Sequence, residues 1–175
     1  GEYTGAGVIF GATGGVMEAA LRTAVEKLTG EELVDLDFVD VRGVKGVKEA
    51  EYELQGKKVK VAVASGLANA RIIMDKVKAG EADYTFIEIM GCPGGCVNGG
   101  GQPHVDSQVR NFIDVRAERA KGLYTLDKNA PIRKAHENPV IIKMYDDYLG
   151  VPGGEKAHHL LHTSYVNRGV NKQAD

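Results

Sequence analysis

The residues of this sequence best suited to chemistry are two cysteines, Cys92 and Cys96, separated by three residues. They lie in residues 91–103, GCPGGCVNGGGQP, and the chain has no other cysteine. Thiolates bind soft metal ions and iron–sulfur clusters. Glycines let the backbone approach a bound group closely and direct N–H groups at its sulfur or anionic atoms. Because a segment so rich in glycine adds little to packing, the pattern favours a metal site over two ordinary buried thiols or a local disulfide.

Two thiolates do not complete a metal centre. A cubane iron–sulfur cluster takes four thiolates, and a structural zinc ion takes four ligands. The remaining ligands must come from histidines of this chain, from a second chain or from a segment that this sequence does not include. Met90, two residues before Cys92, either packs in the core of a strand or lines the site.

The spacing of the histidines favours ordinary structural roles. His158 and His162 are one helical turn apart, but no glutamate stands beside His158 in the order that a metalloprotease motif requires. We therefore expect a solvated or packing helix there. We expect His136 to bond the backbone before the next helix, and His104 to lie at the surface.

Hydrophobic periodicity predicts the elements that must position the cysteines. The predicted helices are 16–28, 67–78, 104–120, 139–149 and 154–165, and the predicted strands are 33–41, 52–54, 59–64 and 84–90. A strand, a helix and a strand over 59–90 form a βαβ unit, which implies a parallel pair. The cysteine segment directly follows the second of these strands, and sites in open α/β sheets form at the carboxyl ends of strands.

A glycine-rich loop over residues 5–15, GAGVIFGATGG, leads into the first predicted helix. It does not fit the dinucleotide template G-x-G-x-x-G, because Phe10 stands where the third glycine is needed, and the chain has no Gly-Lys-Ser/Thr sequence. Its apolar residues suit the wall of a dry pocket better than a phosphate cradle.

Composition excludes several classes of protein. The 175 residues carry 22 basic and 24 acidic side chains, a net charge of −2, which gives no electrostatic reason to expect nucleic acid or an anionic membrane as partner. No apolar run approaches the roughly 18 residues of a membrane span, and the first residues do not resemble a signal peptide. We expect one α/β unit with a helical tail.

Three stretches resemble iron-only (FeFe) hydrogenases. Residues 86–103, FIEIMGCPGGCVNGGGQP, are similar to the third signature motif of that family, and residues 5–22, GAGVIFGATGGVMEAALR, to the segment that walls its active site. Residues 123–165, with RKAHENP, LGVPGG and KAHHLLHTSY, are similar to its C-terminal region. The resemblance covers nearly the whole chain.

The resemblance implies a fold. We expect one lobe of the hydrogenase H-cluster domain, an α/β lobe with a small parallel or mixed sheet flanked by helices, over residues 1–122. Residues 123–175 would form a helical C-terminal region that resembles the family's small subunit.

The resemblance also implies a reaction and a cofactor. The family interconverts H2 with two protons and two electrons at an H-cluster, a 4Fe-4S cubane joined to a di-iron unit that carries CO, cyanide and a dithiolate. By position, Cys92 would ligate the cubane, and Cys96 would ligate it and bridge to the di-iron unit. Met90 would pack against the di-iron ligands, and Phe10 and Gly11 would line the apolar pocket.

The sequence lacks other parts of the family pattern. Two further cubane cysteines, a proton-relay cysteine and a cyanide-binding lysine belong to motifs upstream of this chain. Gly91 stands where the family more often has alanine, and Ala135 where it often has serine. We therefore expect the C-terminal half of a catalytic domain, which by itself neither holds a complete H-cluster nor turns over H2.

The implied partners are the missing N-terminal part of the same protein, a ferredoxin or nicotinamide-linked electron-transfer subunit, and H2 with protons, in a reducing cytoplasm. Two alternatives stay open: an iron–sulfur carrier or assembly protein of the same fold that makes no H2, and an H2-sensing domain. The intact Met90 and cysteine loop favour the enzyme, since a protein without a di-iron site need not retain them.

Overall fold

The computed structural model describes residues 1–166, which belong to two compact units, Gly1–Asn138 and Pro139–Asp175. Among residues 1–166, no helix has both the length and the apolar character needed to cross a bilayer.

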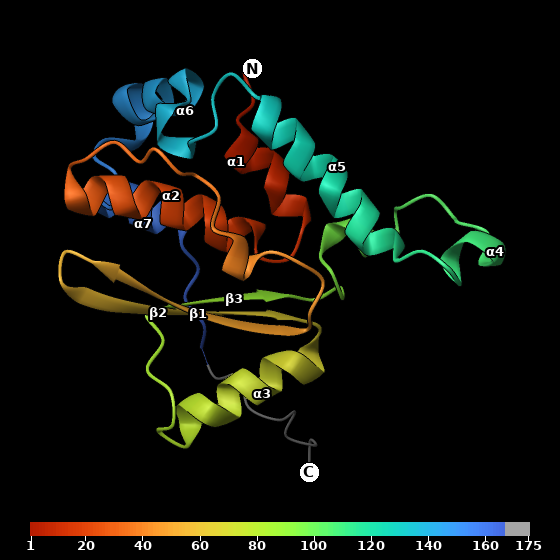
Figure 1. The fold of residues 1–175 in the computed structure, drawn as a ribbon. Coiled ribbons are helices and arrows are strands. Elements are labelled where there is room, and N and C mark those ends of the chain that lie inside the picture. Colours follow the sequence, from red (N-terminus) through yellow and green to blue (C-terminus); the bar gives the residue numbers. More distant parts are fainter. Residues whose placement is uncertain (167–175) are drawn as a thin grey trace, which may run out of the picture. The chain divides into compact units, whose positions relative to one another are not determined.

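The first unit is built on a three-stranded mixed sheet with the order β1-β2-β3 (Figure 1). The strands are β1 (Val47–Leu54), β2 (Lys57–Ser65) and β3 (Phe86–Met90). Strands β1 and β2 are antiparallel and joined by a two-residue turn, in which Gln55 and Gly56 both have positive φ, as a type I′ hairpin turn requires. Strands β2 and β3 are parallel, as the βαβ pattern predicts.

Two helices cover opposite faces of this sheet (Figure 1), α2 (Gly15–Thr29) and α3 (Leu67–Lys78). Because successive side chains of a strand point to opposite faces, β2 serves both helices. Val61 and Val63 form a buried cluster with Met17 of α2. Ala62 and Ala64 form a second buried cluster with Ile73 of α3. The α/β class and the small mixed sheet flanked by helices are thus confirmed.

Further helices and turns complete the first unit. They are α1 (Gly5–Val8), α4 (Ser107–Arg110), α5 (Val115–Asn129) and the 3-10 turns η1 (Ile9–Gly11), η2 (Val39–Val41), η3 (Cys96–Asn98) and η4 (Ala135–Glu137). The second unit contains α6 (Pro139–Met144), a π-helical turn η5 (Tyr145–Leu149) and α7 (Glu155–Leu161). The glycine-rich residues 5–15 are therefore largely helical turns, and the hydroxyl of Thr4 caps the first of them.

The predicted strand at 33–41 is wrong, because this segment is irregular and ends in η2. Its alternating aspartates have other partners. The carboxylate of Asp35 accepts the N–H of Asp37 in a local turn, and Asp37 forms ion pairs with Arg42 and Arg133. Val34 is 95% exposed. A local turn at Asp35 and the ion pairs of Asp37 thus take the place of pairing with another strand.

The single helix predicted at 104–120 is also wrong, because two aspartates start two separate helices there. Asp106 caps α4 by accepting the N–H of Gln108, and Asp114 caps α5 by accepting the N–H groups of Arg116 and Ala117. Such side-chain caps satisfy N–H groups that have no partner within the helix.

The boundary predicted between residues 122 and 123 falls inside α5, whereas the two compact units divide after Asn138.

A buried guanidinium fastens α2 to α5. Arg22 of α2 is fully buried, and it bonds Asp127 of α5 at 2.7 and 2.8 Å and Glu18 at 2.6 Å. Arg42 adds a second cation at Glu18, at 2.8 Å, and Arg133 adds one at Asp127, at 2.7 Å. Each buried carboxylate is thereby paired twice, which is the condition under which buried charges are tolerated.

We predict that Arg22→Met lowers the free energy of unfolding by about 3–5 kcal/mol, because it leaves two carboxylates buried without their shared partner. Urea denaturation followed by circular dichroism measures the loss. Arg71→Met is the matched control, since the Arg71–Asp75 pair is solvent-exposed and should contribute no more than about 1 kcal/mol. Equal losses in the two variants would contradict the role given to Arg22.

Candidate metal centre

The cysteine segment begins where β3 ends and opens with a tight turn. The N–H of Gly95 donates to the carbonyl of Cys92 at 2.9 Å, with Pro93 and Gly94 at the two central positions. Gly94 has φ +88°, so the turn is of type II, which needs glycine at the second central position and favours proline at the first. The turn separates two free thiols, Cys92 and Cys96, and both residues are exposed.

This loop lies against the backbone of the glycine-rich segment at the start of the chain. The N–H of Thr13 donates to the carbonyl of Gly94 at 3.0 Å. A Cβ on Gly95 would lie 2.7 Å from the carbonyl oxygen of Gly11 and 2.7 Å from the amide nitrogen of Thr13, and Gly95 has φ +98°. Glycine is required at this position for both reasons. Two segments about 80 residues apart in sequence thus meet at the cysteines.

Helix α5 holds the other end of the loop. Its Arg119 donates to the carbonyl of Val97 at 2.9 Å and to that of Pro103 at 2.7 Å. Within the loop, the side-chain amide of Asn98 donates to the carbonyl of Pro93 at 3.0 Å. The loop carbonyls are therefore bonded while the two thiols are left exposed.

An open pocket of about 570 Å³ lies between the loop, the first segment and α5. Its lining is largely apolar and consists of Val8, Gly11, Cys96, Val97, Gln102, Arg119, Gly122, Leu123 and Leu126. A Cβ on Gly11 would lie 2.7 Å from the Cδ1 atom of Leu123, so glycine makes room for the leucine side chain. A thiolate at such a pocket can bind a soft metal whose remaining surface faces apolar side chains.

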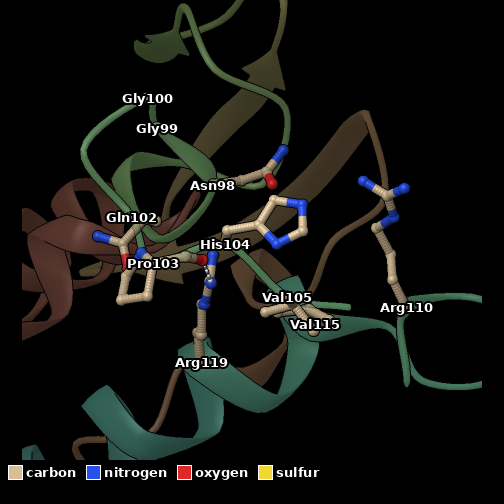
Figure 2. A pocket seen from close by; sticks show the side chains of 10 residues that line it. All are labelled: Asn98, Gly99, Gly100, Gln102, Pro103, His104, Val105, Arg110, Val115 and Arg119. Carbon is tan, nitrogen blue, oxygen red and sulfur yellow. Dashed lines mark hydrogen bonds between the residues drawn. The ribbon is translucent and has the colours of Figure 1, made fainter. Parts of the chain in front are cut away.

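A smaller pocket of about 240 Å³ lies farther along the loop (Figure 2). It is more polar and is lined by Asn98, Gly99, Gly100, Gln102, Pro103, His104, Val105, Arg110, Val115 and Arg119. His104 is exposed in this lining, as the sequence predicts for it. Arg119 belongs to both pockets, and Figure 2 shows its bond to the backbone at Pro103.

Only some of the five predicted site residues lie together in the structure. Cys96 and Gly11 line the larger pocket together, whereas Cys92 and Phe10 are not in its lining, and Phe10 is 46% exposed. Met90 is partly buried at the end of β3. It stands on the sheet face that carries Glu88, because residues two apart in a strand share a face.

His136 and the histidines of the second unit have different surroundings. His136 bonds side chains rather than backbone, which corrects the expectation for it: its ring nitrogens lie 3.1 Å from the hydroxyl of Thr23 and 2.8 Å from a carboxylate oxygen of Glu26. His158 and His162 belong to the second unit, with ring centroids 4.6 Å apart.

One group of side chains near His136 has the composition of a metal site, namely Glu26, His136 and Glu137. The ammonium of Lys134 already lies among the carboxylates, 2.6 Å from Glu26 and 3.1 Å from Glu137. Burial opposes ionisation of Glu26, but the hydrogen bonds from Lys134, Leu33 and His136 prevail and lower its pKa to about 2. The group is therefore a charge cluster that is satisfied without a metal.

Sequence reasoning missed three residues that shape the site, Lys48, Glu88 and Arg119. Lys48 and Glu88 are only 7% and 6% exposed. The sequence signal for Glu88 was a single glutamate in the otherwise apolar strand FIEIM, since a charged residue in a buried strand needs a partner.

Comparison with known proteins assigns almost the whole chain. A family model described as the C-terminal domain of the iron only hydrogenase large subunit matches residues 1–100, and one described as the iron hydrogenase small subunit matches residues 113–168. Iron hydrogenase 1 of Clostridium pasteurianum is 50% identical over 165 residues, which are 94% of this chain and 29% of that protein. The chain thus spans less than a third of this relative.

Two further comparisons bear on function. The structure of a variant of the FeFe-hydrogenase HydA1 from Chlamydomonas reinhardtii superimposes with a TM-score of 0.68 at 42% identity, covering 92% of this chain and 46% of that one. Cytosolic iron-sulfur assembly component 3 of Rattus norvegicus is 32% identical over 168 residues, 92% of this chain and 34% of that protein. Similar sequences therefore occur in proteins named for hydrogen chemistry and in proteins named for cluster assembly.

We predict that Gly95→Ala lowers the free energy of unfolding by about 3 kcal/mol, because a Cβ there meets backbone atoms and a positive φ. Gly100→Ala in the same loop is the matched control, since a Cβ on Gly100 meets no atom within 4 Å, and its effect should stay within about 0.5 kcal/mol. Urea unfolding of both variants compares them. Similar stabilities would show that the loop does not depend on its close approach to residues 11–13.

We also predict that Glu26 stabilises the fold in a pH-dependent way. Its folded-state pKa of about 2 lies below the ordinary value of 4.5, so its contribution is complete above about pH 4.5 and is lost as the pH falls toward 2. Glu26→Gln should cost about 2 kcal/mol at pH 7 and much less at pH 2.5. Urea midpoints at both pH values test this, with the exposed Glu53→Gln as control. A cost that does not change with pH would contradict the assignment.

Proposed function

Because this chain belongs to the family formed by the C-terminal domains of iron-only hydrogenase large subunits, we propose that it is the C-terminal part of an iron-only hydrogenase. The complete protein catalyses the reversible reaction 2 H⁺ + 2 e⁻ ⇌ H2, and this chain supplies two of the cysteines that bind its H-cluster. The observation that carries the proposal is the loop from Cys92 to Cys96. It presents two free thiols at the end of a parallel strand, one of them on a largely apolar pocket.

The donor atoms fit part of the group that this function needs. Two thiolates are half of the set that a cubane takes, and the remaining two come from the part of the protein that precedes this segment. When bound, the H-cluster supplies electrons and the place where protons combine. Gly11, Val97 and Leu123 give the side of the pocket that holds Cys96 a largely apolar lining.

Each of the predicted site residues has a role in this proposal. In the complete protein, Cys92 would be a ligand of the cubane, and Cys96 would be a ligand of both the cubane and the di-iron unit with its CO, cyanide and dithiolate ligands. Met90 would lie against those ligands. Gly11 lines the pocket within this chain, and the exposed ring of Phe10 would complete the apolar wall once the rest of the catalytic domain lies against it.

The partners in this proposal follow from the same incomplete site. The chain works joined to the preceding half of the catalytic domain, and it receives electrons through a ferredoxin or a nicotinamide-linked subunit. A reducing cytoplasm suits it, because two exposed thiols four residues apart stay reduced there.

A second candidate function is iron–sulfur cluster assembly without H2 chemistry. The match to the rat assembly component over 92% of this chain favours it. Both functions need the two thiols, so they differ in what the complete protein does with the bound group. Met90 and the apolar pocket beside Cys96 favour the hydrogenase, because a cubane carrier has no di-iron ligands to enclose.

We predict that the 175-residue chain, purified without oxygen, carries little iron and acid-labile sulfide, whereas the complete protein carries a full cluster.

Cys92→Ala and Cys96→Ala should each lower the iron content of the complete protein several-fold, because each removes a thiolate ligand. Gly100→Ala, in the same loop, is the control and should leave the iron unchanged. Iron, sulfide and the visible spectrum measure the outcome, together with H2 uptake using a dye acceptor.

The results separate the two functions. H2 uptake by the matured complete protein that is lost in Cys96→Ala supports the hydrogenase. A full cluster with no H2 turnover favours cluster assembly. Robust H2 turnover by the isolated 175-residue chain would overturn the proposal that the chain supplies only part of the site.

A further inference from the structure

One peptide group beside the cysteine loop is held between two buried charges of opposite sign. The carbonyl of Thr13 accepts a hydrogen bond from the ammonium of Lys48 at 3.0 Å. The N–H of Gly14, at the other end of the same peptide group, donates to the carboxylate of Glu88 at 2.6 Å. Both charged residues are buried, Lys48 on β1 and Glu88 on β3. Side chains of the two outer strands thus bond this peptide group at its carbonyl and at its N–H. These two hydrogen bonds are the grip on the Thr13–Gly14 peptide.

Each charge also binds a second backbone group. The other carboxylate oxygen of Glu88 accepts the N–H of Met17 at 2.7 Å, and Lys48 donates to the carbonyl of Gly43 at 2.8 Å. Helix α2 has glycine at its N-cap and therefore no capping side chain of its own. Glu88 takes over that function from a strand 71 residues away in sequence, and its negative charge suits the helix N-terminus.

These contacts close a ring that includes the ligand loop. From Glu88 the chain runs along β3 to Cys92 and on to Gly94. The carbonyl of Gly94 accepts the N–H of Thr13 at 3.0 Å. The N–H of the next residue, Gly14, donates to the carboxylate of Glu88, which closes the ring. The position of the loop relative to the pocket wall is therefore set on both sides, by the strand that carries the cysteines and by a hydrogen bond from the gripped segment.

Ionised side chains hold the Thr13–Gly14 peptide more strongly than neutral side chains would. Hydrogen bonds to charged partners are shorter and stronger than neutral ones, and four backbone groups depend on these two side chains. An apolar pair could fill the same volume, but it would leave the backbone groups of the buried residues Thr13, Gly14 and Met17 without partners. The cost of burying two charges is thus offset by a fixed backbone.

We propose that Glu88 and Lys48 are positioning residues for the cluster ligands, which hold the loop bearing Cys92 and Cys96 at a fixed place relative to the pocket wall at Gly11–Thr13. The inference rests on the proposed function for what the loop binds. The grip on the Thr13–Gly14 peptide does not depend on a bound cluster, because all of its atoms belong to this chain. Both side chains bond backbone groups, so they act on the loop through the backbone.

The first test is amide hydrogen exchange of the full 175-residue chain, read residue by residue by NMR. Glu88→Gln and Lys48→Met should each speed exchange at Thr13 and Gly95 by roughly tenfold, because each removes a charged hydrogen-bond partner. Measurements are made at pH 7, since burial lowers the pKa of Lys48 to about 8 and the lysine must stay protonated.

The matched control for this test is Ile73→Ala, which removes a fully buried side chain from the opposite face of the sheet. It lowers global stability without touching the grip, so exchange at Thr13 and Gly95 should rise no more than at other core amides. Loop exchange that is unchanged in Glu88→Gln, or raised equally in Ile73→Ala, would overturn the proposal.

The second test uses the complete protein with its cluster, and it separates positioning from mere stability. Glu88→Gln should shift the electron paramagnetic resonance signature of the bound cluster, whereas Ile73→Ala should leave it unchanged. A cluster signature that Glu88→Gln does not move would overturn positioning of the ligands. If the wild-type complete protein binds no cluster, the proposed function fails, while the exchange test still decides whether the grip exists.

Discussion

The fold of the first unit depends on the buried guanidinium of Arg22. It joins Glu18, on its own helix, to Asp127 near the end of α5, with no exposed surface. Two parts of the lining of the larger pocket belong to or adjoin these helices: α5 carries Leu123, and α2 directly follows the segment that contains Gly11. The width of the pocket therefore depends on how α2 and α5 are placed relative to each other. The two hydrogen bonds from Arg22 to Asp127 add a directional contact to this relation, beside the packing of Leu123 at Gly11.

The same strategy recurs beside the cysteines. Charged side chains of the sheet bond backbone groups of the first segment, and glycines allow the two backbones to touch. The protein thus places its cysteine loop by main-chain contacts and leaves the thiols themselves exposed. Because these hydrogen bonds form without any bound group, less conformational freedom would be lost if a metal group bound to the loop.

In the proposed function, the two thiols are half of the ligand set of a cubane cluster. The two thiols present a defined pair of sulfur atoms, and an incomplete site makes binding of the whole group conditional on a second segment. This holds for a hydrogenase and for a cluster-assembly protein alike, which is consistent with the similarity of the chain to both. The distinction lies in the apolar pocket next to Cys96, which has a use when a further unit must be kept from water.

The sequence by itself determined the features that depend on neighbours in the chain. The strand–helix–strand unit, the helix at 67–78 and the loop from Cys92 to Cys96 follow from local periodicity and spacing. Tertiary structure decided whatever depends on distant partners. Gly14 and Glu88 are 74 residues apart, so no local pattern shows that a strand glutamate caps a helix. The strand expected at 33–41 failed for the same reason, because the partners of Asp37 include Arg133, 96 residues away. Local signals specify which residues can bind or pack, whereas the fold determines what they meet.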